Sequence, residues 1–128
     1  NNDCIVDKWS GKVGIRRIKL LTKEKNKSVF RFEINNKPIF IKGANWIPAD
    51  SFIPRIKSSK YKKLLKLANQ ANMNMSRVGD GAIYEDDMFY QFCDEFGLLV
   101  WQDFMFGYGM HPTHERTFVE NCRAEIDR

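Results

Sequence analysis

The 128-residue sequence predicts an α/β chain, in which antiparallel β-strands are followed by a parallel sheet and its connecting helices. Two observations lead to this fold class. Between residues 14 and 40, apolar and polar residues alternate in short runs separated by turn residues, which is typical of paired strands. After residue 56, apolar residues recur at helical spacing, and short apolar runs separate the helical stretches. Strands that alternate with helices form parallel sheets with right-handed crossovers.

The antiparallel part rests on two β-rich runs, "VGIRRIKLL" and "VFRFEIN", in which apolar side chains alternate with polar ones. The charged stretch "TKEKNKS" lies between them, and "NNKP" follows as a tight turn. We therefore expect antiparallel strands up to about Ile34, as the last strands of a β-sandwich. This places a boundary between residues 1–34 and residues 35–128.

The parallel part begins after that boundary. We expect parallel strands at three places: Ile39–Lys42, Met75–Val78 and Leu98–Trp101. The first helix should run from about Ser59 to Met73, with Ser58 or Ser59 as its N-cap.

The second and third helices carry similar end signals. Asp86 or Asp87 can cap the second helix, and Gly97 is a typical residue at a helix end. The third helix should begin near Thr113, directly after Pro112. Each of the expected helices has one apolar face at helical spacing. The members of these faces are Tyr61, Leu64, Leu65 and Ala68; Phe89, Phe92, Cys93 and Phe96; and Phe118, Cys122 and Ile126.

Composition excludes several classes of function. The net charge is +5, but the basic residues alternate with apolar ones, which indicates solvated faces rather than a nucleic-acid surface. No apolar stretch is long enough to suggest a membrane span. Cys4, Cys93 and Cys122 lack metal-ligand spacing, and the last two lie on helical stripes as small buried apolar residues. His111 and His114 have no third ligand nearby, so we expect neither a metal nor a cofactor.

Polar and aromatic residues gather directly after each expected parallel strand. The three stretches are "ANWIPAD", "RVGDGAIYED" and "WQDFMFGYGMH". In parallel α/β folds, ligands bind at the carboxyl ends of the strands. We therefore interpret the stretch that starts at Gly43 as a loop, and as one wall of a site that the other two stretches complete.

Several longer motifs carry a resemblance to a known family. The stretches are "PIFIKGANWIPADSFIPRI", "NMNMSRV", "GAIYEDDMFYQFCDEFGLLVWQDFMF" and the later "HP". Together they resemble the β-mannosidases of glycoside hydrolase family 2. The resemblance implies the first three βα units of a (β/α)8 TIM barrel, preceded by the end of a β-sandwich domain. It also implies retaining hydrolysis of terminal, non-reducing β-mannosyl residues from an oligosaccharide or glycoconjugate, by two glutamates and without a cofactor.

In that family the two catalytic glutamates lie on the fourth and seventh barrel strands. They are therefore expected beyond Arg128, and the isolated chain is expected to be inactive without the remainder of the barrel. Glu85 is the tempting carboxylate of "YEDD", but we expect it at a helix start, serving the cap and the helix dipole.

The residues that the resemblance carries over are supporting ones. Arg77 matches an arginine that hydrogen-bonds the nucleophile carboxylate. Trp101 and Asp103 close the third strand, where a carboxylate accepts sugar hydroxyls or orients Arg77. Asn45 and Trp46 are expected to face the same mouth, with an exposed indole against a pyranose ring. The expected site is thus Asn45, Trp46, Arg77, Trp101 and Asp103, with Pro48 and Asp50 shaping the first loop.

One motif departs from the family. The second strand is usually followed by Trp-Gly-Gly-Gly after Arg-Val, and here the sequence reads "RVGDGA". Gly79 stands where a tryptophan would line the sugar subsite, and Asp80 stands where a glycine would be. Two alternatives therefore stay open: a degenerate carbohydrate-binding module derived from such a barrel, and a small free-standing α/β domain with an unrelated role.

Overall fold

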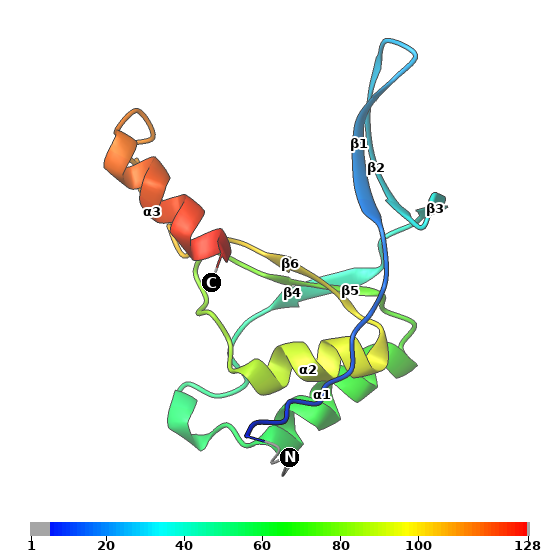
Figure 1. The fold of residues 1–128 in the computed structure, drawn as a ribbon, viewed down its shortest axis with the longest axis vertical. Coiled ribbons are helices and arrows are strands. Elements are labelled where there is room, and N and C mark those ends of the chain that lie inside the picture. The colour runs from blue at the N-terminus through cyan, green and yellow to red at the C-terminus, as the bar shows by residue number, and fades with distance from the viewer. Residues whose placement is uncertain (1–5, 128) are drawn as a thin grey trace, which may run out of the picture. The chain divides into compact units, whose positions relative to one another are not determined.

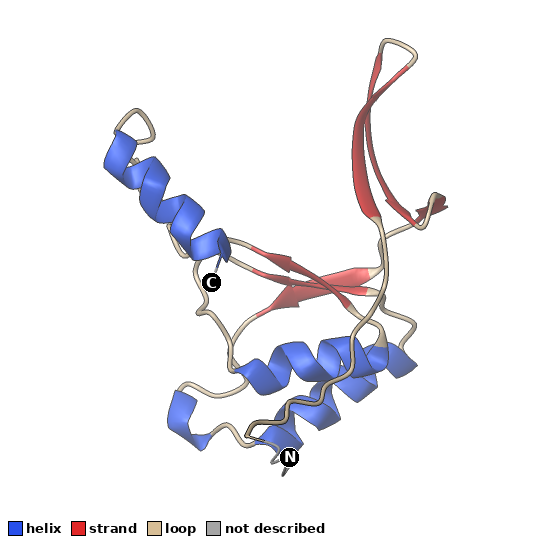
Figure 2. Ribbon diagram, in the orientation of Figure 1, coloured by secondary structure: helices blue, strands red, loops and turns tan. Residues whose placement is uncertain are grey.

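The computed structural model describes residues 6–127 (Figure 1). The chain forms two compact units, Asn1–Lys42 and Gly43–Arg128. Each unit contains its own sheet, and Figure 2 shows the strands of both.

The first unit contains an antiparallel sheet in the order β1-β2-β3. Its strands are β1 (Ile18–Glu24), β2 (Lys27–Ile34) and β3 (Lys37–Ile39). The expected antiparallel pairing is confirmed, and it extends past Ile34 because Ile39 of β3 pairs with Phe32 of β2.

Asparagines explain why this sheet turns where it does. The backbone φ angles are 46° and 64° at Lys25 and Asn26, and 50° and 63° at Asn35 and Asn36. Two consecutive residues with positive φ form the turn that matches the twist of a two-residue hairpin, and asparagine tolerates this conformation well. The Asn35 side chain also accepts a hydrogen bond of 2.9 Å from the backbone N–H of Arg17.

The second unit contains a parallel sheet in the order β4-β5-β6. Its strands are β4 (Gly43–Trp46), β5 (Met75–Val78) and β6 (Leu99–Gln102). Its helices are α1 (Ser58–Gln70), α2 (Asp87–Phe96) and α3 (Arg116–Asp127), with a short 3-10 helix, η1 (Ile53–Arg55), before α1. The expected alternation of parallel strands and helices is confirmed.

The first parallel strand does not lie where the sequence predicted it. Ile39–Lys42 was chosen for its apolar side chains, whereas the strand is Gly43–Trp46, within the stretch interpreted as a loop. Backbone packing decides its start, because a Cβ atom on Gly43 would lie 2.0 Å from the carbonyl oxygen of Met75. Only glycine permits two backbones to approach this closely.

The ends of α1 and α2 illustrate two kinds of cap. Asp86 is the N-cap of α2, and its side chain accepts a hydrogen bond of 2.9 Å from the N–H of Met88. Gly97 ends α2 in the left-handed conformation, with φ of 70°. Both features are as expected. By contrast, the expected serine cap of α1 is wrong, because the N-cap is Lys57 and no side chain bonds the helix start.

The core of the second unit lies between the parallel sheet and the helices α1 and α2, which contact each other on one face of the sheet (Figure 1). Its buried members are Tyr61, Leu65, Val78, Phe89, Phe92, Cys93 and Leu98. They include five of the eight residues expected on the apolar faces of the two helices, and fully burying one such side chain contributes about 1.5–3 kcal/mol. The other three, Leu64, Ala68 and Phe96, are half-buried. Burial raises the pKa of the Cys93 thiol to about 12.

Helix α3 differs from the other two. It begins at Arg116 rather than near Thr113, and none of its residues is buried within the described part of the chain. The expected apolar face is only half realised, because Cys122 is half-buried and Ile126 is 69% exposed. Phe118 packs on the Phe106 ring, with the ring centroids 5.2 Å apart. Cys4 lies outside the described residues.

Candidate functional site

The strand register determines which side chains share a face of the parallel sheet. Asn45 pairs with Arg77, and Arg77 pairs with Trp101. Because side chains alternate along a strand, these three residues form one row on one face. The next row, Trp46, Val78 and Gln102, belongs to the opposite face, where Val78 lies in the core with α1 and α2. The row of Asn45, Arg77 and Trp101 therefore faces away from these two helices.

Arg77 makes the central contacts of this row. One guanidinium nitrogen, Nη2, forms an ion pair with Oδ2 of Asp103. The other, Nη1, donates a hydrogen bond of 3.3 Å to the side-chain oxygen of Asn45. Asp103 is itself held at the end of β6, because its backbone N–H donates to the carbonyl oxygen of Val78 at 3.0 Å. The structure thus brings together Asn45, Arg77 and Asp103. In the sequence, Asn45 lies 32 positions before Arg77, and Asp103 lies 26 positions after it.

The guanidinium is suited to bind a further acidic or hydroxyl group. The bonds to Asn45 and Asp103 account for two of the five N–H donors that an arginine carries. The Arg77 side chain is 41% exposed, whereas that of Asp103 is 15% exposed. A half-buried carboxylate that fixes a more exposed guanidinium keeps it in one orientation toward an incoming group. Trp101, beside Arg77 in the register, is 38% exposed on the same face.

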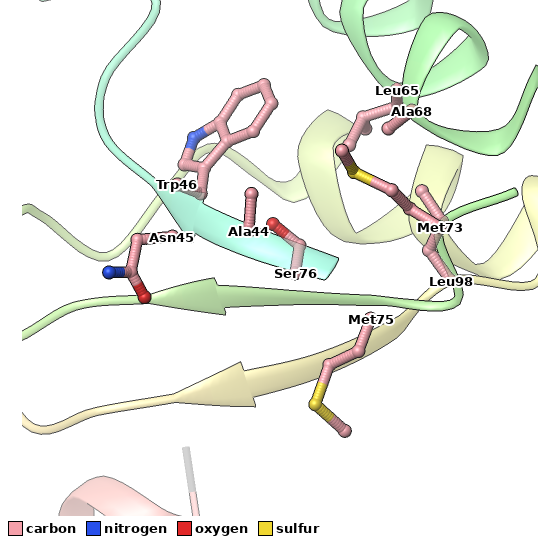
Figure 3. A pocket seen from close by; sticks show the side chains of 9 residues that line it. All are labelled: Ala44, Asn45, Trp46, Leu65, Ala68, Met73, Met75, Ser76 and Leu98. Carbon is pink, nitrogen blue, oxygen red and sulfur yellow. The ribbon is translucent and has the colours of Figure 1, made fainter. Parts of the chain in front are cut away.

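Trp46 does not join this group, and the expectation that it is exposed beside Asn45 is wrong. Its indole is half-buried and packs on Phe89 and Tyr61, with ring centroids 4.8 Å and 6.4 Å away. Figure 3 shows the side chains of Asn45 and Trp46 on opposite sides of β4. The physical reason is that residues 43–46 form a strand, so consecutive side chains must point to opposite faces.

Sequence reasoning missed the role of Glu85. Its side chain does not cap α2 but is buried, with 6% exposure. One carboxylate oxygen accepts a hydrogen bond of 2.9 Å from the Trp46 indole, and the other accepts one of 2.6 Å from the Tyr61 hydroxyl. Burial and the bond to Glu85 raise the pKa of the Tyr61 hydroxyl. A tyrosine on a buried helical face needs a partner for its hydroxyl, and this was the signal available in the sequence.

The loop after β4 is ordered by Asp50, as expected. Its carboxylate accepts a hydrogen bond of 2.9 Å from the N–H of Phe52, and this bond holds the pKa of the Asp50 carboxyl below its ordinary value. Arg55 and Lys60 approach the same carboxylate at 3.7 Å and 3.5 Å. These contacts connect the loop to the start of α1.

The family departure lies directly beside the site. A Cβ atom on Gly79 would meet only the Nη1 atom of Arg77, at 3.7 Å, which is ordinary van der Waals contact. Gly79 does not have a positive φ, so its backbone does not require glycine. The position therefore accommodates a Cβ atom next to the Arg77 guanidinium.

His111 packs among aromatic rings, with its ring centroid 4.8 Å from that of Phe106 and 5.9 Å from that of Phe118. Among residues 6–127, no three or more His, Cys, Asp or Glu side chains are grouped so as to hold a metal ion. In the same part of the chain, no helix is both long enough and apolar enough to cross a membrane.

The sequence of this chain is similar to those of known β-mannosidases. No family model matches the chain. The β-mannosidase of Capra hircus is 47% identical over 120 residues, which cover 91% of this chain and 14% of that protein. The β-mannosidase of Rattus norvegicus is 54% identical over 97 residues, covering 76% of this chain and 11% of the relative. The resemblance to β-mannosidases is confirmed.

The β-mannosidase-like chain also matches solved structures. The crystal structure of the β-D-mannosidase of Dictyoglomus thermophilum superposes with a TM-score of 0.77 and 53% identity, over 88% of this chain and 14% of that one. An exo-chitosanase of Amycolatopsis orientalis superposes with a TM-score of 0.60 and 25% identity, over 70% of this chain and 10% of that one. The chain thus spans about one seventh, 14%, of the first β-mannosidase that it matches.

Proposed function

We propose that the chain is part of a retaining exo-β-mannosidase of glycoside hydrolase family 2, which removes terminal, non-reducing β-mannosyl residues from oligosaccharides or glycoconjugates. The observation that carries this proposal is the similarity to a solved β-D-mannosidase, at 53% identity and a TM-score of 0.77. Identity of 45–54% to curated β-mannosidases also favours it over a degenerate carbohydrate-binding module or an unrelated α/β domain.

In this proposal the second unit supplies the first three βα units of a (β/α)8 barrel, a fold of about 250 residues. The parallel order β4-β5-β6, with a helix after each strand, supports it. The strands up to Ile34 belong to the preceding β-sandwich domain, and residues 35–128 begin the catalytic domain. Strand β3, which pairs with β2, is then part of the connection between the two domains.

The site residues support catalysis rather than perform it. Arg77 hydrogen-bonds the nucleophile carboxylate of the complete barrel, which keeps that group ionised and correctly aimed. Asp103 orients Arg77, and Asn45 and Trp101 contact the sugar from the same row of the sheet. The two catalytic glutamates come from the remainder of the barrel, so the isolated chain has no activity of its own.

The test uses the full-length protein that contains this segment, assayed with an aryl β-mannoside. We expect the full-length protein to hydrolyse the substrate with retention of configuration, which proton NMR of the first-formed sugar product detects. We expect no hydrolysis by the 128-residue chain. Arg77→Ala should lower kcat by about 10²-fold, the effect of losing one preorganised electrostatic partner. Arg116→Ala is the matched control, because its side chain is 90% exposed on α3. Hydrolysis by the isolated chain, or wild-type kcat in Arg77→Ala, would contradict the proposal.

A further inference from the structure

The buried carboxylate of Glu85 connects three separate elements of the second unit. It precedes α2, and it accepts hydrogen bonds from Trp46 at the end of β4 and from Tyr61 in α1, at 2.9 Å and 2.6 Å. A carboxylate that is 6% exposed is costly unless its oxygens are bonded, and here each oxygen has a donor. Hydrogen bonds are directional, so the Glu85 carboxylate fixes the positions of the Trp46 indole and the Tyr61 hydroxyl as well as stabilising the packing of the three elements.

The contact with Trp46 matters because it fixes the end of β4 relative to α1 and to the residues before α2. Trp46 is also the last residue of β4 that pairs with β5, opposite Val78. Beside it lies a mostly apolar cavity of about 130 Å³, whose lining includes Ala44, Trp46, Leu65, Ala68 and Met73 (Figure 3). The indole packs on the rings of Phe89 and Tyr61, and the bond to Glu85 adds a directional constraint that ring packing does not supply.

Movement of Trp46 is transmitted to the site through the adjacent residue. Asn45 precedes Trp46 on the strand and accepts from Arg77 at 3.3 Å, close to the limit of about 3.5 Å beyond which a hydrogen bond is lost. A displacement of a few tenths of an ångström at the end of β4 is thus enough to separate Asn45 from Arg77. The Glu85 contact lies on the opposite face of the sheet, outside the row that faces substrate.

We propose that Glu85 is a positioning residue: by fixing the Trp46 indole, it holds Asn45 in hydrogen-bonding distance of Arg77 and so shapes the sugar subsite. The catalytic consequence rests on the function proposed above, whereas the structural link between Glu85 and Asn45 does not. The two are therefore tested by different measurements.

The kinetic test compares three variants of the full-length protein on an aryl β-mannoside. Glu85→Leu removes the acceptor for both donors, and we expect kcat to fall by about 10-fold to 10²-fold, the scale that a displacement of about 1 Å produces. Glu85→Gln keeps an oxygen for the indole and offers an N–H to the Tyr61 oxygen, so kcat should recover to within about threefold of wild type. Asn69→Ala is the control for lost stability, because it breaks a 2.9 Å hydrogen bond from α1 to the carbonyl of Phe96 at the other end of the helices.

The structural test follows the side-chain amide of Asn45 and the indole N–H of Trp46 by nitrogen-15 NMR in the 128-residue chain. We expect both signals to move in Glu85→Leu. In Trp46→Phe the indole signal disappears and the Asn45 signal should move, whereas in Asn69→Ala the Asn45 signal should stay in place. An unchanged Asn45 signal in Glu85→Leu would overturn the inference, as would kcat losses that simply follow the melting temperature in all variants. If the wild-type protein does not hydrolyse β-mannosides, the proposed function fails and the NMR result alone decides the role of Glu85.

Discussion

Replacing Gly43 by alanine tests the least expected feature of the fold, the start of β4. A Cβ atom at this position would lie 2.0 Å from the carbonyl oxygen of Met75 and 2.9 Å from its carbonyl carbon. Ordinary contact between such atoms needs about 3.5 Å, so the two strands must separate by more than 1 Å at this end. Both atoms that it meets are backbone, so no side-chain rotation relieves the clash.

The cost can be worked out from what the separation breaks. Gly43 pairs with Met75 at the first position of the β4–β5 ladder, and opening it loses one or two hydrogen bonds of about 1 kcal/mol each. Met75, now 7% exposed, would also regain part of its solvent contact, at about 1 kcal/mol. We therefore expect Gly43→Ala to lower the free energy of unfolding by about 2–3 kcal/mol.

The assay is urea unfolding of the chain, followed by circular dichroism, with two other glycines as controls. Gly81→Ala should change the free energy by less than about 0.5 kcal/mol, because nothing lies within 4 Å of its Cβ position and its φ is not positive. Gly97→Ala should cost about 1 kcal/mol through its φ of 70° alone. If Gly43→Ala unfolds at the same urea concentration as Gly81→Ala, the close approach of β4 and β5 is incorrect.

Three further predictions concern the cap of α2, the family departure and alkaline pH. Asp86→Ala should cost about 1 kcal/mol in urea unfolding, because the cap bond to the Met88 N–H is lost, and Asp87→Ala should cost clearly less. Gly79→Trp should lower KM for an aryl β-mannoside about fivefold in the full-length protein, since stacking contributes about 1 kcal/mol; an unchanged KM in a folded variant would contradict this expectation. The Cys93 thiol is neutral in the folded state, with its pKa raised to about 12 by burial, whereas the unfolded thiol has its ordinary pKa of 9.0. Its contribution to stability is therefore present below about pH 9 and lost as pH rises toward 12, so the urea midpoint should fall between about pH 9 and pH 11, and fall less in Cys93→Ala.

The sequence by itself determined the features that depend on neighbours along the chain. Local conformational preference accounts for the turns that contain asparagine, for the Asp86 cap and for the Gly97 helix end. Periodicity accounts for the alternation of strands and helices and for the apolar faces of α1 and α2. The motifs around Asn45, Arg77 and Asp103 also identified the resemblance to β-mannosidases. That these three residues lie together follows from a general property of parallel sheets, since the carboxyl ends of their strands meet at one edge.

The tertiary structure alone decided where one backbone meets another. Gly43 begins a strand because Met75 approaches it, and hydropathy favoured the preceding apolar residues instead. Because the strand is Gly43–Trp46 and not Ile39–Lys42, the side chain of Trp46 packs against the core and that of Asn45 lies on the other face of the sheet. Consecutive side chains along a strand point in opposite directions. Glu85 became a buried acceptor only because Trp46 and Tyr61, 39 and 24 positions away, converge on it. Such contacts depend on distances between elements, which residue periodicity along the chain does not encode.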